Sequence, residues 1–221
     1  MQKIFRTLST LVILIGLLPA APAAAQPLPQ DVITVGTVTG SAGSIVDVPV
    51  SIRDTSGTPL GMDQPPGSKI QSYSIKVNYA PASAVQSITF TRAGITTSLT
   101  PTFESSPSGP GTISLLDTFQ ESTNPIPFTL NAALPGNQVA HLLITLSPTA
   151  TPGALTLTLD PTLTQLTDQA GSGATKETVA AGNLLLVSGV VNVTAFVPAL
   201  STWALILLAA ALAIIAIRIR L

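Results

Sequence analysis

The sequence has no cysteine and one histidine, His141, and charged residues make up 9% of its 221 positions. Without cysteine, zinc sites, iron–sulfur sites and redox-active thiols lose their usual ligand. With a single histidine, the Ser–His–Asp and Cys–His arrangements of nucleophilic catalysis are almost excluded. No pair of carboxylates has the setting that glycoside hydrolysis needs. We therefore expect no cofactor, no bound metal and no enzymatic activity.

Basic residues are scarce in the middle of the chain. Residues 26–196 contain five Lys or Arg against ten Asp or Glu, a net charge of −5. A protein that binds nucleic acid needs a basic face to displace counterions from the phosphates. The composition therefore excludes nucleic acid as a partner. The positive mean hydropathy of +0.54 comes mainly from the two ends of the chain.

The first 25 residues have the features of a secretory signal peptide. Lys3 and Arg6 precede an apolar run from Leu8 to Leu18, and a stretch of small residues ends at Ala25. The run is too short to span a bilayer, which takes about 20 apolar residues, whereas a cationic start and an A-x-A-like site are typical of export signals. We predict cleavage after Ala25 and export through the inner membrane, with residues 26–30 as a short linker. A retained amphipathic anchor is the alternative.

Residues 195–221 have the features of a membrane-directed tail. Val197–Ile217 is a run of 21 residues without a charge, and Arg218 and Arg220 follow it. A helix of that length crosses a bilayer at a rise of about 1.5 Å per residue. The arginines favour a cytoplasmic tip, and Trp203 suits the membrane interface. The pattern predicts a C-terminal transmembrane helix that anchors the exported domain.

This tail also resembles the IPTL-CTERM sorting signal of Gram-negative bacteria, a relative of PEP-CTERM. The residues of the sorting motif are Val197, Pro198, Leu200, Ser201 and Trp203. The resemblance implies that a membrane protease of the exosortase type recognises the motif, removes the helix and passes the protein to the cell surface. Val197, Ala199 and Thr202 replace the Ile, Thr and Glu of the family pattern. A plain membrane anchor without cleavage is the alternative.

Residues 31–194 show the alternation of apolar and polar residues that is typical of β-strands. Gly- and Pro-rich turns separate the alternating segments. Short strands spaced in this way predict an all-β sandwich rather than βα units. The predicted strands are Ser44–Arg53, Lys69–Tyr79, Val85–Thr91, Gly111–Thr118, Gln138–Leu146, Ala154–Leu159 and Leu184–Val193.

Several of these segments together resemble the cohesin domain, a jelly-roll β-sandwich related to carbohydrate-binding modules. Its first two strands are similar to residues 33–38 and 43–50, and its third strand to Tyr73–Tyr79, where Ala80-Pro81 replaces the Asp-Pro turn. Its late strand pair resembles Val139–Leu146 and Leu155–Leu159, joined through Thr151-Pro152-Gly153, and its closing strand resembles residues 188–193. The resemblance implies a cohesin-like fold over 31–194.

The resemblance also implies a non-catalytic binding or scaffolding module with a dockerin-like protein as its partner. No contact motif is present that would map the binding residues. The alternatives are a polysaccharide-binding module and a structural protein of the cell surface or matrix. Tyr73 and Tyr79 are the candidate glycan contacts, but they alternate in step with Ile75 and Val77, which favours the core instead.

The other polar candidates favour simpler interpretations. His141 lies opposite the most apolar side of its strand and is expected at the surface. Asp160, Asp168 and Glu177 lack the dense oxygen pattern of a calcium loop and are expected to be solvated turn carboxylates. Two long segments, Asp54–Ser68 and Phe119–Asn137, are expected to be mobile surface loops.

Overall fold

A computed structural model describes residues 28–169 and 173–195. The predicted signal peptide, the sorting motif and the C-terminal helix lie outside these ranges. Among the described residues, no helix is long and apolar enough to cross a membrane.

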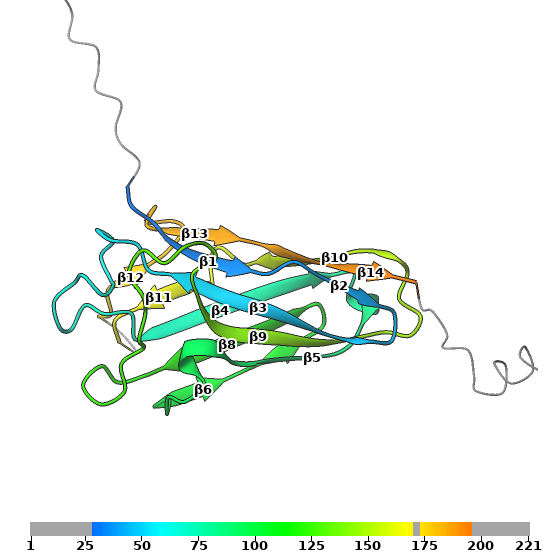
Figure 1. The fold of residues 1–221 in the computed structure, drawn as a ribbon, viewed down its shortest axis with the longest axis horizontal. Coiled ribbons are helices and arrows are strands. Elements are labelled where there is room, and N and C mark those ends of the chain that lie inside the picture. Colours follow the sequence, from blue (N-terminus) through cyan, green and yellow to red (C-terminus); the bar gives the residue numbers. More distant parts are fainter. Residues whose placement is uncertain (1–27, 170–172, 196–221) are drawn as a thin grey trace, which may run out of the picture.

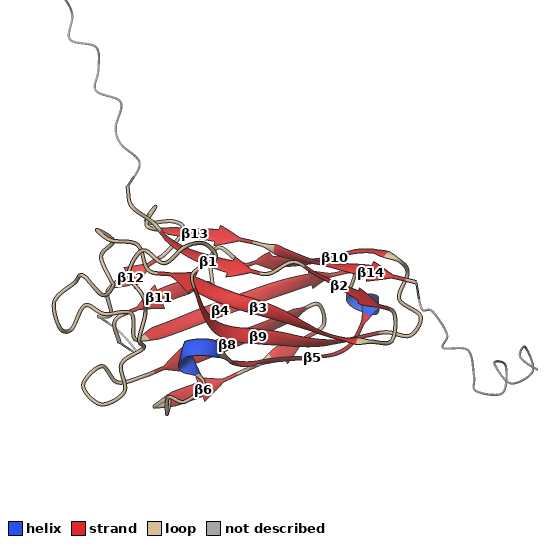
Figure 2. Cartoon of the chain, in the orientation of Figure 1, coloured by secondary structure: helices blue, strands red, loops and turns tan. Residues whose placement is uncertain are grey.

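The described chain is built from strands, with two short 3₁₀ turns at Ala82–Ala84 and Gly94–Thr96 (Figure 2). The strands are β1 Asp31–Val35, β2 Val38–Ser41, β3 Ile45–Arg53, β4 Ser72–Ala80, β5 Val85–Arg92, β6 Phe103–Ser105, β7 Ser108–Gly109, β8 Thr112–Thr118, β9 Asn137–Leu146, β10 Gly153–Leu159, β11 Gln165–Thr167, β12 Lys176–Glu177, β13 Leu184–Val187 and β14 Gly189–Thr194.

The strands form two sheets that pack face to face (Figure 1). The smaller sheet has the order β13-β1-β3-β9-β5. The larger sheet contains β12-β11-β4-β10-β14-β2, and β8 lies along the other edge of β4, followed by β6 and β7. Strands β10 and β11 share one edge of β4, because β10 pairs with its second half and β11 with its first three residues. The all-β sandwich expected from the alternation is thus confirmed.

The core lies between the two sheets and is formed by the apolar half of each alternation. Val48, Val50 and Ile52 of β3 are fully buried, as are Ile75 and Val77 of β4. Removing such side chains from water is the main favourable term in folding, at about 25 cal/mol for each Å² of apolar surface. A cysteine-free chain can therefore depend on packing and on the sheet hydrogen bonds.

The predicted strand Leu184–Val193 is wrong as one element, because two strands occupy it. β13 pairs with β1 in the smaller sheet, and β14 pairs with β2 in the larger sheet. The chain changes sheets between Val187 and Gly189, beside the point where residues 36–37 make the same change between β1 and β2. At this crossing a Cβ on Gly189 would overlap the carbonyl oxygen of Gly36 and lie 2.7 Å from that of Val35. Only glycine allows the two crossing segments to approach so closely.

The two long loops are packed rather than free, which corrects the expectation of mobile surface. In the first loop Thr58 and Leu60 are buried, and the Leu60 amide donates to the Glu177 carboxylate at 2.8 Å. In the second loop Ile126 and Phe128 are buried. A few apolar residues in a polar, Pro- and Gly-rich segment were enough to attach each loop to the sandwich.

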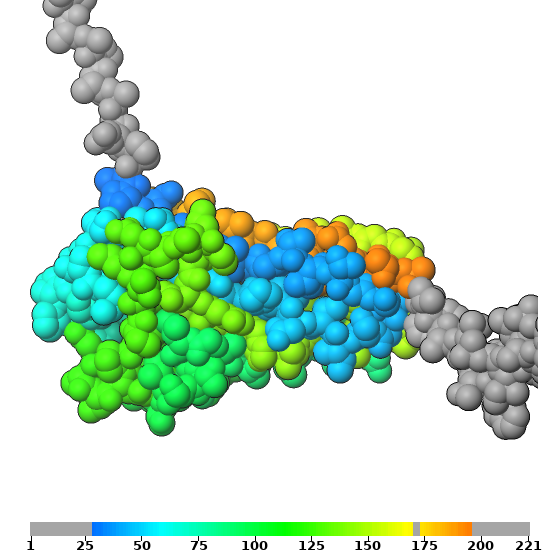
Figure 3. Space-filling model, in the orientation of Figure 1, coloured from blue at the N-terminus to red at the C-terminus, as the bar shows by residue number. Residues whose placement is uncertain are grey.

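The sandwich is elongated, and the two ends of the described chain lie at its opposite ends (Figure 1). The last strand, β14, runs to the end where β4 finishes at Ala80, since β10 pairs Thr156 with Ala80 and Gly153 with Val193. Ser72, at the start of β4, lies about 25 Å away along the strand, at a rise of 3.2–3.4 Å per residue. In the space-filling view the N-terminal residues in blue pack along the orange segment that contains β13 and β14 (Figure 3).

Candidate functional site

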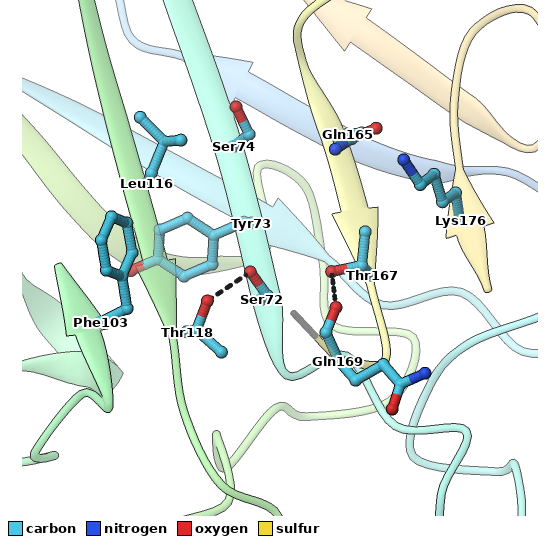
Figure 4. A pocket seen from close by; sticks show the side chains of 10 residues that line it. All are labelled: Ser72, Tyr73, Ser74, Phe103, Leu116, Thr118, Gln165, Thr167, Gln169 and Lys176. Carbon is cyan, nitrogen blue, oxygen red and sulfur yellow. Dashed lines mark hydrogen bonds between the residues drawn. The ribbon is translucent and has the colours of Figure 1, made fainter. Parts of the chain in front are cut away.

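A shallow hollow of about 200 Å³ opens on the outer face of the larger sheet, where β4 begins (Figure 4). Side chains of β6, β8, β4, β11 and β12 surround it, together with Gln169 just after β11. The lining residues are Ser72, Tyr73, Ser74, Phe103, Leu116, Thr118, Gln165, Thr167, Gln169 and Lys176.

The strand register places five of these residues in one row across the sheet. Phe103 pairs with Thr118, which pairs with Ser72 on its other side. Ser72 in turn pairs with Thr167, and Thr167 pairs with Lys176. Residues that are paired across strands project to the same face of a sheet. An aromatic ring and an amino group therefore stand at the two ends of a row whose centre holds only hydroxyl side chains.

A second row lies beside the first and contains Leu116, Ser74 and Gln165. In both rows the residue on β4 is a serine, and the small side chains on this central strand leave the space of the hollow. The hydroxyl of Ser72 donates to the Asp117 carbonyl at 2.8 Å, and that of Ser74 donates to the Leu163 carbonyl at 2.9 Å. The serines are thus held in place, and the hollow is a fixed feature of the sheet.

The hollow offers hydrogen-bonding groups of several kinds but little charge. Gln165 and Gln169 supply amides, and Lys176 supplies a positive charge. Phe103, with 53% of its surface exposed, supplies an apolar rim. No histidine or carboxylate is among the described residues that line the hollow.

A buried polar pair lies beneath the hollow. The Tyr73 hydroxyl donates to Oδ2 of Asp117 at 2.7 Å, and both side chains are buried between the sheets. Burial raises the pKa of Asp117 to about 6, and burial followed by the charge of Asp117 raises the pKa of Tyr73 above its usual range. Oδ1 of Asp117 is buried without a partner.

The tyrosines considered as glycan contacts do not lie at the surface of the hollow as a platform. Tyr73 is 1% exposed, and its ring stands 6.3 Å from that of Phe119 in the core. Tyr79 is half-buried against the core, and its hydroxyl points toward the Gly109 carbonyl at 3.4 Å. This agrees with their alternation in step with Ile75 and Val77. The exposed aromatic ring beside the hollow is that of Phe103.

The acidic residues of the last third have different environments. Asp160 accepts hydrogen bonds from the amide and hydroxyl of Thr162, and it lies 3.5 Å from the amino group of Lys76, as suits a turn carboxylate. Asp168 accepts from the Thr175 amide at 3.0 Å. Glu177 is fully buried, so the expectation that it is solvated is wrong. Glu177 lies on a strand of two residues, in which Lys176 is the exposed residue. A strand this short shows no alternation from which its buried side could be predicted.

His141 lies on β9 at the outer face of the smaller sheet, as expected. Its Nδ1 is 3.1 Å from Oδ2 of Asp47, and 23% of its side chain is exposed. It belongs to the sheet opposite the hollow and takes no part in that site.

Residues from the short strands of the site were missed by sequence reasoning. Phe103, Gln165 and Lys176 lie on strands of two or three residues, which are too short to show alternation. The alternation that favours the core for Tyr73, Ile75 and Val77 implies that Ser72 and Ser74 face outward, and the structure confirms this. No local signal marks Phe103 as exposed, since Phe119 and Phe128 also stand alone in polar segments and are buried.

Comparison with known proteins gives two findings. Residues 197–221 match the IPTL-CTERM motif. The fold is similar to that of cohesin domains in solved structures, whereas no match was found among curated proteins.

Three cohesin structures represent the likeness. CaCohA2 of Clostridium acetobutylicum, solved in complex with CaDoc0917, is 24% identical with a TM-score of 0.53 over 75% of this chain and 100% of that one. The third ScaC cohesin of Acetivibrio cellulolyticus, in complex with the ScaB dockerin, is 18% identical with a TM-score of 0.52 over 74% and 99%. The seventh ScaB type I cohesin of Pseudobacteroides cellulosolvens is 17% identical with a TM-score of 0.51 over 76% and 95%. At these identities the likeness shows a cohesin-type β-sandwich.

Proposed function

We propose that this protein is an exported, surface-tethered and non-catalytic binding module that recognises a dockerin-like protein partner through the hollow. The observation that supports the site is the row of outward-facing side chains across five strands, with exposed Phe103 and Lys176 at its two ends. The fold supports the class of partner, since cohesins of similar fold have been solved in complex with dockerins.

The arrangement of the ends suits a tethered binding module. The chain leaves the sandwich after β14, at the end farthest from the hollow (Figure 1). The IPTL-CTERM motif follows at once, from residue 197. Attachment through this tail turns the hollow away from the attachment point and toward other proteins. Sorting by an exosortase-type protease accounts for the position of the motif.

Binding to a dockerin-bearing protein exported by the same organism tests the proposal. We expect Ser74→Arg to fill the hollow and to weaken binding at least tenfold in a calorimetric titration, because a long cation replaces a small hydroxyl in the middle of the surface. Thr89→Arg, on an exposed position of β5 in the other sheet, is the matched control and should bind normally. Equal affinity of both variants would show that this face is not used, and no binding of the unchanged protein would reject the dockerin partner.

A polysaccharide is a second candidate ligand, because exposed Phe103 stands at the same hollow as the amides of Gln165 and Gln169. Sugar sites combine a ring face with hydrogen-bonding side chains. Affinity electrophoresis in gels that contain cell-wall polysaccharide tests this ligand. Retardation that is lost in Phe103→Ala and kept in Tyr79→Phe would favour a glycan over a protein.

The tail is tested separately by the intact mass of the protein recovered from the cell surface. A mass that lacks the apolar helix indicates sorting cleavage near the motif. A mass that retains residues 204–221 indicates a plain anchor.

A further inference from the structure

Two carboxylates contact each other in the interior, at the end of the sandwich that holds the hollow. Asp31 is the first residue of β1 and Glu177 the last of β12, and both are fully buried. Their side chains lie within hydrogen-bonding reach of each other. Such contact places two groups of like charge in a region of low dielectric, where full ionisation of both is strongly unfavourable.

Each carboxylate has one oxygen that is satisfied by the loop 54–68. Oδ1 of Asp31 accepts from the Thr55 amide at 2.7 Å, with the Thr58 hydroxyl at 3.4 Å. Oε1 of Glu177 accepts from the Leu60 amide at 2.8 Å. The remaining oxygens, Oδ2 of Asp31 and Oε2 of Glu177, are buried and have no donor. A single proton placed between these two oxygens would give both of them a hydrogen-bond partner.

The charges around the pair do not relieve the repulsion. Asp54, the residue that follows β3, is fully buried and adds negative potential at both carboxylates. Asp63 and Lys69 act on Asp54 from the loop, with opposite signs. Among the described residues, no lysine or arginine donates to Asp31 or Glu177. No described group of three or more His, Asp or Glu side chains is arranged to hold a metal ion.

We propose that Asp31 and Glu177 share one proton, and that this proton fastens β12 to β1 and to the loop 54–68. Burial, followed by the hydrogen bond and the charge of Glu177, raises the pKa of Asp31 to about 9. Burial also raises the pKa of Glu177. At neutral pH the pair therefore keeps its proton.

The shared proton also controls one wall of the hollow. β12 consists of two residues, and Glu177 points inward while Lys176 points to the hollow. Its pairing with β11 involves only Leu166 with Glu177 and Thr167 with Lys176. Because so little else holds β12, loss of the proton pushes Glu177 away from Asp31 and displaces Lys176.

Unfolding of the full-length chain by urea as a function of pH tests the proposal without any partner. The native pair binds one proton more than the unfolded chain between the usual pKa of Asp31, 3.8, and its folded pKa of about 9. Stability is therefore highest at the acid end of this range and falls as pH rises through it. We expect the unfolding equilibrium constant to increase up to tenfold per unit between about pH 7 and pH 9.

Amide variants identify the proton. In Asp31→Asn the retained Oδ1 still accepts the hydrogen bond from the Thr55 amide, and the new side-chain NH2 donates to Glu177. We therefore expect the pH dependence of stability between pH 7 and 9 to disappear. Glu177→Gln should behave in the same way. The double variant places two side-chain NH2 groups face to face. Both can only donate hydrogen bonds, so this variant should be less stable than either single variant. Asp160→Asn, which replaces a carboxylate with a pKa of about 2, is the control and should keep the wild-type slope.

Carbon-13 NMR of the side-chain carboxyls in the unchanged protein gives a readout that needs no variant. A titration of the pair above pH 7, accompanied by shifts of the β12 amides, would support the shared proton. Full ionisation of both carboxyls below pH 5 would overturn it. An increase in melting temperature on addition of calcium, reversed by EDTA, would also overturn it in favour of a bound cation. None of these outcomes depends on what binds the hollow.

Discussion

The hydroxyl of Tyr73 donates to Oδ2 of Asp117 across 2.7 Å, directly beneath the serines that form the centre of the hollow. Tyr73 lies on β4 and Asp117 faces it on β8 in the strand register. The pair therefore joins the two strands that contribute most to the floor of the candidate site.

Loss of the Tyr73 hydroxyl should destabilise the protein. In Tyr73→Phe the buried Asp117 carboxylate loses its hydrogen-bond donor, and an unsatisfied buried acceptor costs about 1–3 kcal/mol. The loss should be larger above the Asp117 pKa of about 6 than below it, where the carboxyl is neutral. Urea unfolding at pH 5 and pH 8 measures the difference. An equal effect at both values would contradict this role of the charge.

Asp117 should make stability fall with rising pH over a limited range. Its pKa is raised by burial from 3.8 to about 6, so the native state holds the additional proton between these values and stability decreases as pH rises from about 4 to 6. At about 1.4 kcal/mol per pKa unit the total is about 3 kcal/mol. Asp117→Asn should remove this part of the slope in a pH series of melting curves and leave the slope above pH 7 unchanged.

The crossing of the sheets should not tolerate a side chain at Gly189. In Gly189→Ala the new methyl group overlaps the backbone carbonyls of Gly36 and Val35, which cannot move without breaking the crossing. We expect a loss of about 3 kcal/mol in the free energy of unfolding. Gly109→Ala is the control, because its Cβ would meet only the Thr112 methyl group at an ordinary 3.4 Å. Similar losses in both variants would rule out the close approach as the cause.

The first long loop should contribute to stability through Leu60. This side chain is fully buried, so Leu60→Ala should cost about 2–5 kcal/mol. Met62, two residues further on, is 42% exposed, and Met62→Ala should change stability by less than about 0.5 kcal/mol. Chemical denaturation distinguishes the two. A small effect of Leu60→Ala would mean that the loop detaches readily from the sandwich.

Asp160 should stabilise the protein only at pH values at which its carboxyl is ionised. Hydrogen bonds from Thr162 lower its pKa from 3.8 to about 2, so its contribution is present above pH 4 and is lost as pH falls toward 2. Melting curves between pH 2 and pH 5 should show a smaller acid loss for Asp160→Asn than for the unchanged chain. A parallel loss in both would indicate that the Thr162 contacts do not favour the ionised carboxyl.

Local patterns in the amino-acid sequence are enough to identify the class of fold and much of its core. Alternation over seven or more residues places β3, β4 and β9 with the correct side inward, because burial of one face requires a period of two. The side of β4 that carries Ser72 and Ser74 followed from the same period. The IPTL-CTERM pattern was recognisable because it is a contiguous motif.

The candidate site and the buried carboxylate pair arise from contacts between strands that are far apart in the sequence. Phe103 and Lys176 are 73 residues apart in the sequence, and long-range strand pairing alone places them in one row. Glu177 looked like a solvated turn residue because a two-residue strand shows no period, and its contact with Asp31 spans nearly the whole domain. Local patterns report which side of a strand is apolar, whereas contacts between distant strands depend on register and sheet order, which emerge only when the sandwich closes.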